Sequence, residues 1–344
     1  MPRTNRQWSL ARTPRGRLTT DDLALVESPI PQIGPNEILV RNTWLSIDPS
    51  IRIRLSSTTP LGYLPPIRPG EPLVGLALGT VIDTRNPDFA VGDLVSHIFG
   101  FRDYAVIGTR ADTIGGYGLP TRIDTRGMPP QWYLGPLGSS GLTAYAALTE
   151  VLQLRQEDTV WVSAAAGGVG AIAAQIAKLR GATVLGSAGR ADKVEFLRQE
   201  LGIAAFDYHD PTLHESLAEL APDGIDAYFD NVGGDHLAAA MDNLRPRGRI
   251  AVCGAVSGYD GAPHSGNPDL FQIVSKELRI QGFRAGSYNH LEGSMRQEVG
   301  GYLTAGDMVY HETIFDDLTQ APTALLAMLA GKTIGKTLCR LTSE

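Results

Sequence analysis

From about residue 131 to residue 300, short apolar runs alternate with longer segments in which the apolar residues have helical spacing. The runs that predict strands are residues 160–162, 182–189, 227–232, 248–254 and 278–283. The segments that predict helices are residues 141–148, 171–178, 192–201 and 236–244. Strands that alternate with helices predict an α/β fold with a parallel, doubly wound sheet.

The two ends of the chain have a different pattern. Residues 1–127 contain short β-type runs broken by proline and glycine, which predicts a small, irregular β-rich domain. From about residue 308 the pattern is again β-like, and residues 321–329 have the spacing of an apolar helix. We expect this tail to fold back onto the N-terminal domain. Residues 1–127 and 305–344 would then form one domain, and residues 128–304 the other.

A turn of small residues follows the first strand of the predicted sheet. Residues 160–162 lead into residues 163–170, and a helical pattern starts at once. Glycines let the backbone approach a pyrophosphate, and the N–H groups at a helix start point at its negative charge, so this order is typical of a dinucleotide site. The alternative is a tight strand-to-helix connection without a ligand. The residues that we expect to contact the dinucleotide here are Gly167, Gly168, Val169 and Gly170.

The second strand of this region indicates which nucleotide is bound. In NAD-binding proteins an acidic residue about 20 positions after the glycines binds the ribose 2′-hydroxyl. Here the strand ends with Ser187 and Gly189, and the cations Arg190 and Lys193 follow. Cations in place of the acid favour the 2′-phosphate of NADP. Asp192 is a negative charge among these cations, and we expect it to interact with the positive N-terminus of the following helix. The alternative is that both cations are merely solvated.

Composition narrows the classes of function. The chain has 344 residues and a net charge of −7, which argues against a nucleic-acid partner. Its two cysteines, Cys253 and Cys339, are far apart, so we expect neither a disulfide framework nor a zinc site, and we expect a reducing cytosol. No segment approaches the ~20 apolar residues of a membrane span. The arginine-rich first seventeen residues predict a basic strand rather than a transit peptide.

The order of the motifs resembles the zinc-independent medium-chain dehydrogenase/reductase superfamily. Within it, the chain is similar to the prostaglandin reductase and alkenal double-bond reductase branch. Besides the glycine turn, the motifs that carry the resemblance are residues 5–8, 45–49, 137–145, 186–189, 229–234, 248–254 and 335–337. They span nearly the whole chain in family order.

The resemblance implies a GroES-like catalytic domain, built from both chain ends, beside a Rossmann cofactor domain. It also implies NADPH-dependent reduction of the carbon–carbon double bond of enals and enones, and homodimers that pair the edges of their Rossmann sheets. By position, Lys193 and Tyr208 match the family's 2′-phosphate contacts. The alternative for Tyr208 is a surface tyrosine without this role. The residues that match the nicotinamide end are Asn231, Cys253, Gly254, Ala255, Val256, Ser257, Phe283, Arg284 and Ala285. Asn231 also ends a predicted strand at the ligand edge, where a turn-forming role is the alternative.

The chain departs from the family pattern at three places. Ser50 replaces a tyrosine that usually lines the substrate pocket, and Ser139 and Ser140 replace a methionine and a proline or threonine. These two departures imply a wider or more polar pocket, which Tyr63 could also line. Thr333 stands where the family has a cofactor-contacting asparagine.

Tyr259 is the candidate catalytic residue, and it also belongs to the predicted substrate pocket. Hydride transfer to the β-carbon of an enone builds negative charge on the carbonyl oxygen, and a phenol beside that oxygen stabilises the charge or delivers a proton. The alternatives are a loop tyrosine that only packs, or a ribose hydroxyl in this role. For the whole protein, the alternatives are quinone reduction and a catalytically silent NADPH-binding protein.

Overall fold

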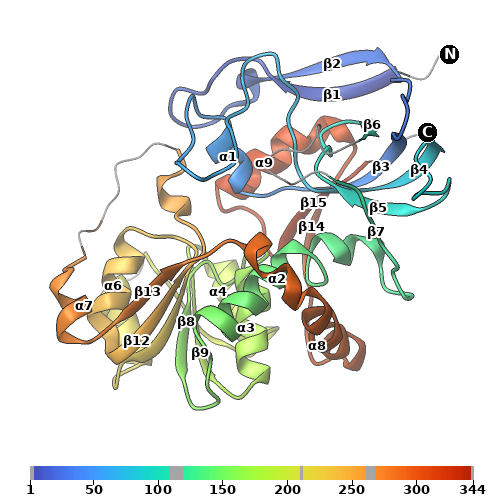
Figure 1. Ribbon diagram of the computed structural model, residues 1–344. Helices are drawn as coiled ribbons and strands as arrows, with labels where there is room; N and C mark the ends of the chain where they lie inside the picture. Colours follow the sequence, from blue (N-terminus) through green and yellow to red (C-terminus); the bar gives the residue numbers. More distant parts are fainter. Residues whose placement is uncertain (1–3, 109–118, 210–211, 261–265, 267, 342–344) are drawn as a thin grey trace. The chain divides into compact units, whose positions relative to one another are not determined.

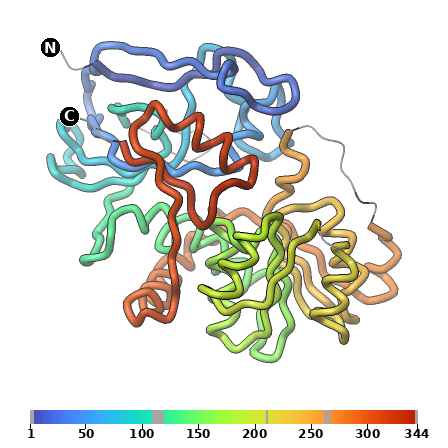
Figure 2. Tube along the Cα trace, turned by 180° about the vertical axis from the view of Figure 1, so that it is seen from behind, coloured from blue at the N-terminus to red at the C-terminus, as the bar shows by residue number. Residues whose placement is uncertain are grey.

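The computed structural model describes residues 4–108, 119–209, 212–260, 266 and 268–341. The chain divides into two units. Unit 1 comprises Met1–Leu134, Glu312–Thr333 and Thr337–Glu344, and unit 2 comprises Gly135–His311 and Ile334–Lys336. Figures 1 and 2 show the course of the chain from two sides. The C-terminal tail and the N-terminal region therefore share one unit.

Unit 2 is built on a six-stranded sheet in which all paired neighbours run parallel, in the order β10-β9-β8-β11-β12-β13. Its strands are β8 (Thr159–Val162), β9 (Thr183–Ala188), β10 (Ala204–Asp207), β11 (Ile225–Asp230), β12 (Leu244–Val252) and β13 (Arg279–Gly282). The strand order reverses beside β8, which is where doubly wound sheets bind their ligands. The predicted α/β fold with a parallel sheet is confirmed.

Helices connect and cover these strands (Figure 1). They are α2 (Ser139–Ala146), a π-helical turn (Ala147–Val151), α3 (Gly170–Leu179), α4 (Ala191–Gln199), α5 (Leu213–Leu220), α6 (Asp235–Asn243), α7 (Phe271–Ser275) and α8 (Glu292–Ala305). Helices α5 and α6 pack against the side chains on one face of the sheet, among them the fully buried Trp161 and Tyr228. Short 3-10 turns lie at Val256–Gly258 and Ala285–Leu291.

Unit 1 is β-rich, as its pattern predicts. A sheet with the strand order β14-β15-β3-β4-β5-β7 also pairs β6 with β3, and β1 pairs with β2 in a separate ribbon. The strands are β1 (Thr4–Leu10), β2 (Leu23–Pro29), β3 (Ile38–Ser46), β4 (Ala77–Thr84), β5 (Leu94–His97), β6 (Tyr104–Ile107), β7 (Thr121–Arg122), β14 (Glu312–Asp316) and β15 (Lys336–Arg340). Its helices and 3-10 turns are α1 (Ser50–Arg54), α9 (Ala321–Leu329), Thr20–Asp22, Pro130–Leu134 and Leu318–Gln320.

The tail is an integral part of unit 1. Strand β15 pairs antiparallel with β3, and α9 contributes Leu325 to a core that also contains Leu45 and Phe101. In Figure 2 the red tail lies beside the blue N-terminal strands. Burial of these apolar side chains stabilises the association of the two chain ends.

Candidate functional site

The turn between β8 and α3 is the centre of the candidate site. Ala164 adopts a left-handed backbone conformation (φ 48°), and its carbonyl accepts the Gly167 N–H at 2.9 Å. A side chain at Gly170 would collide with the same carbonyl, so only glycine fits there. Among the described residues, no hydrogen bond uses the N–H groups of Gly168, Val169 or Gly170. Free N–H groups at a helix start are what a pyrophosphate needs, so this turn fits a dinucleotide.

The C-terminal segment of unit 2 lies along this turn. The Gly335 N–H donates to the Ala166 carbonyl at 2.8 Å, and Gly167 forms a parallel β-bridge with Gly335. A Cβ atom at Gly168 would meet the Lys336 side chain at 3.1 Å. The segment at Gly335 and Lys336 therefore packs against the turn, and a larger residue at Gly168 would require Lys336 to shift.

The end of β9 is covered by Tyr208. A Cβ atom at Gly189 would lie 2.5 Å from the Tyr208 hydroxyl, so the phenol rests on bare backbone. The Tyr208 N–H also donates to the Ala188 carbonyl at 3.1 Å. Burial raises the pKa of the Tyr208 phenol above its ordinary value. Tyr208 is thus a neutral hydroxyl beside the strand end where the sequence predicts the 2′-phosphate.

The two predicted cations next to this strand end differ in their surroundings. The Arg190 guanidinium is bound by Asp192 at 2.9 Å (Nε to Oδ1) and 2.7 Å (Nη2 to Oδ2). The Lys193 ammonium makes no hydrogen bond or ion pair with the described residues. Partial burial, and then the Arg190 charge, lower the pKa of Lys193. Lys193 is therefore the cation here whose ammonium no described carboxylate binds directly, although the Asp192 charge lies near it.

Ser187 and His236 support this end of the site from the core. Ser187 is fully buried, and its hydroxyl accepts the Trp161 indole N–H at 3.1 Å. The His236 ring stacks on Trp161 at 5.7 Å and meets Tyr208 edge-on at 4.7 Å. The role of His236 was not predicted from the sequence, where this residue begins the predicted helix 236–244.

The opposite end of the site is organised by Asp230, at the end of β11. This fully buried carboxylate accepts the Tyr228 hydroxyl at 2.8 Å and the N–H groups of Val232 and Gly233 at 3.0 and 2.8 Å. Burial raises its pKa above the ordinary value. Its backbone carbonyl accepts the Cys253 N–H at 2.8 Å, so Asp230 joins the turns that follow β11 and β12.

Asn231 is held in one orientation by Ser163. The Asn231 N–H donates to the Ser163 hydroxyl at 2.9 Å, and its side-chain Nδ2 donates to the Ser163 carbonyl at 2.7 Å. The side-chain carbonyl of Asn231 has no hydrogen-bond partner among the described residues. It is therefore available to a ligand with a donor group, such as a carboxamide.

The loop from Cys253 to Tyr259 lies against the same strand ends. The Val256 N–H donates to the Asn231 carbonyl at 3.2 Å, and the Ser257 hydroxyl donates to the Val232 carbonyl at 2.6 Å. The Tyr259 hydroxyl accepts a long hydrogen bond from the Ala255 N–H at 3.4 Å. It also lies 3.1 Å from where a Cβ of Gly254 would be. Tyr259 and Asn231 are thus brought together in unit 2.

Other predicted residues at this end have structural partners. Burial, and then the Asp230 charge, raise the pKa of Cys253 to about 12, so this thiol is no nucleophile. The Phe283 ring contacts Phe229 edge-on at 6.5 Å. Arg284 precedes and Ala285 begins the 3-10 turn that follows β13.

Three predicted residues belong to unit 1. Ser50 is exposed at the start of α1, and Tyr63 is half-buried in the loop that follows this helix. Thr333 is buried, and its hydroxyl accepts a hydrogen bond from Thr337 at 2.9 Å. Their roles toward substrate and cofactor stay predictions.

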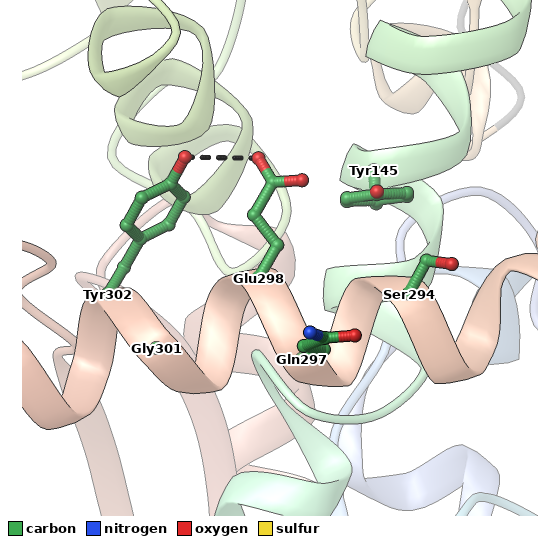
Figure 3. Close-up of a pocket in the computed structure, with 6 residues that line it drawn as sticks. All are labelled: Tyr145, Ser294, Gln297, Glu298, Gly301 and Tyr302. Atoms are coloured by element: carbon green, nitrogen blue, oxygen red, sulfur yellow. Dashed lines mark hydrogen bonds between the residues drawn. The ribbon is translucent and has the colours of Figure 1, made fainter.

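A cavity of about 530 Å³ lies between α2 and α8 of unit 2 (Figure 3). Its lining includes the Tyr302 hydroxyl, which donates to Glu298 at 3.0 Å. Glu298 also pairs with Arg180 at 2.8 Å. None of the predicted site residues lines this cavity.

In the described part of the chain, no three His, Cys, Asp or Glu side chains are grouped so that they could hold a metal ion. None of the described helices is both long and apolar enough to span a bilayer.

Comparison with known proteins identifies the family. Residues 6–113 match the model of an N-terminal oxidoreductase domain, and residues 168–299 match that of a zinc-binding dehydrogenase. A 2-alkenal reductase (NADP(+)-dependent) of Nicotiana tabacum is 37% identical over 90% of this chain and 89% of its own. An NADPH-dependent curcumin reductase of Escherichia coli is 34% identical over 99% and 98%. The crystal structure of CurA from Vibrio vulnificus in complex with NADPH is 32% identical and covers 98% of this chain and 100% of its own, with a TM-score of 0.90. The chain therefore belongs to the zinc-independent medium-chain dehydrogenase/reductase superfamily of oxidoreductases.

Proposed function

We propose that this protein uses NADPH to reduce the carbon–carbon double bond of α,β-unsaturated aldehydes or ketones. The observation that carries the proposal is that two different groups of residues lie at the two ends of the candidate site, along one edge of the parallel sheet. One end presents cations and a phenol beside Gly189, and the other presents Asn231 and Tyr259. Relatives named for alkenal and curcumin reduction support this class of substrate.

Each group of residues has a distinct task in this proposal. NADPH, when bound, supplies the hydride. The open N–H groups of Gly168 and Val169 bind the pyrophosphate, and Lys193 and Tyr208 bind the 2′-phosphate. Asn231 accepts a hydrogen bond from the carboxamide and thereby orients the nicotinamide. Tyr259 donates a hydrogen bond to the carbonyl oxygen, where charge develops during the reaction.

An isotope experiment tests the reaction. With NADPH deuterated at C4 and an enone as substrate, we expect deuterium on the β-carbon of a saturated carbonyl product, measured by NMR. Deuterium on the carbonyl carbon would mean that the protein forms alcohols. A semiquinone product with a quinone panel, and no turnover of enones, would favour quinone reduction. No consumption of NADPH with either panel would indicate a binding protein without activity.

Replacement of Tyr259 by phenylalanine tests the proposed donor. The variant keeps the ring and loses the hydroxyl, so kcat should fall at least tenfold. Removal of one such donor typically lowers kcat by a factor of ~10²–10³, and water can partly replace the hydroxyl. The dissociation constant for NADPH should stay nearly unchanged. Full activity of the variant, with deuterium still on the β-carbon, would assign the role to another group such as a ribose hydroxyl.

We further propose a homodimer in the cytosol. Strand β13 ends the sheet of unit 2, and the neighbouring helix α7 exposes Phe271 (69%) and Val274 (68%). A free strand edge beside exposed apolar side chains is a surface that a second copy can cover. The cytosolic location rests on the sequence alone, which has only two cysteines, Cys253 and Cys339, far apart in the chain.

A further inference from the structure

The Asp192 carboxylate accepts hydrogen bonds from N–H groups of the kind that bind phosphate. It accepts the Arg190 Nε–H at 2.9 Å and the Arg190 Nη2–H at 2.7 Å, and it also accepts the Lys193 backbone N–H at 3.0 Å. The first two form the planar fork that matches carboxylate and phosphate oxygens alike. The third lies in the first turn of α4, where the helix dipole favours an anion.

We propose that Asp192 is a specificity-determining residue, because its carboxylate competes with the ribose 2′-phosphate for Arg190 and for the N-terminus of α4. The inference rests on the proposed use of NADPH. Asp192 lowers the affinity for NADPH and leaves the affinity for NADH nearly unchanged, since NADH has no phosphate at this position. The residue thereby reduces the preference that Lys193 and Tyr208 create.

The physical setting makes this competition effective. Arg190 holds the pKa of the Asp192 carboxyl below its ordinary value, so the group is charged at neutral pH and repels a phosphate. The Arg190–Asp192 pair is about half exposed, with side-chain exposures of 45% and 48%. Exposed pairs are weak, so a phosphate can displace the carboxylate at a small cost in affinity.

Binding of two small nucleotides isolates this effect from catalysis. We would measure the dissociation constants of adenosine 2′,5′-bisphosphate and of 5′-AMP by calorimetry at low ionic strength. Asp192→Asn should bind the bisphosphate about twofold to fivefold more tightly than the wild type, the size expected for release of an exposed ion pair. Its affinity for 5′-AMP should stay the same. Glu195→Gln is the matched control, because it removes one exposed negative charge from the same helix.

A double-mutant cycle tests the route of the effect. In an Arg190→Gln background, Asp192→Asn should bring a smaller gain, because the donor fork that it releases is absent. Unchanged or weaker bisphosphate binding by Asp192→Asn would overturn the inference, and weaker binding would make Asp192 a residue that orients Arg190 for the phosphate. A wild type that binds both nucleotides equally would instead overturn the proposed 2′-phosphate site. The isotope experiment with enones tests the reaction separately from both results.

Discussion

At the scale of single residues, Lys193 has the largest predicted effect on cofactor choice. Its ammonium is partly buried and has no ion-pair partner among the described residues, whereas the Arg190 charge is balanced by Asp192. Lys193→Ala should raise the KM for NADPH about tenfold or more, because a hydrogen bond to a charged group contributes about 1.5–3 kcal/mol. The KM for NADH, measured in the same assay, is the internal control. A wild type that uses both cofactors equally would contradict this role.

Single-residue roles were predictable from sequence only where the residue lies in a local pattern. Lys193 follows a strand end, and its place in the first turn of α4 could be inferred. Ser163 and Asp230 also follow apolar runs, but their roles depend on partners that come from distant turns. Ser163 binds Asn231, 68 positions further along the chain. No local signal could have predicted that His236 stacks on Trp161.

At the scale of elements, the turn before α3 depends on the absence of a side chain at Gly170. Gly170→Ala should destabilise the protein and weaken NADPH binding, because the new Cβ would collide with the Ala164 carbonyl and force the turn open. Differential scanning calorimetry and NADPH titration would measure both effects. Gly301→Ala in α8 is the matched control, since a Cβ there meets nothing within 4 Å. That change should leave binding intact and stabilise α8 by up to about 1 kcal/mol. Equal effects of the two changes would contradict the steric argument.

Two elements that were not predicted from the sequence, β10 and α8, have weak hydrophobic patterns. Strand β10 is an edge strand that pairs with β9. It has only four residues, so its apolar run is short. Helix α8 contains three glycines and buries only Met295 and Val299, so it shows little helical periodicity. Helix α9, which buries one apolar face, was predicted over its whole length, Ala321–Leu329. Burial alone did not decide the outcome, because helix α5 buries Leu213 and Leu217 and was not predicted, whereas the largely exposed strand β13 was.

At the scale of the whole molecule, the proposed dimer depends on the surface formed by α7 and β13. A double substitution, Phe271→Glu and Val274→Glu, should convert the dimer to a monomer, because two charges would be buried without partners. Light scattering after gel filtration measures the mass, and circular dichroism checks the fold. Val91→Glu is the control, since Val91 in unit 1 is also largely exposed (64%). A dimer that survives the double substitution would place the interface on another surface.

Buried histidines that carry no charge contribute to the response of the whole protein to acid. Burial lowers the pKa of His236 from 6.5 to about 4, with a smaller opposing effect of Asp235. When the pH falls below 6.5, the unfolded chain binds this proton before the folded one does, so the free energy of unfolding decreases until about pH 4. For His236 alone the full difference in the free energy of unfolding corresponds to about 3 kcal/mol.

His236→Phe keeps an aromatic ring beside Trp161 and cannot titrate, so it should lose less stability than the wild type between pH 7 and pH 4. Urea unfolding at both pH values measures the difference, and His290→Gln, which removes an exposed histidine, should behave like the wild type. The same loss in His236→Phe and wild type would mean that His236 titrates alike in the folded and unfolded chains.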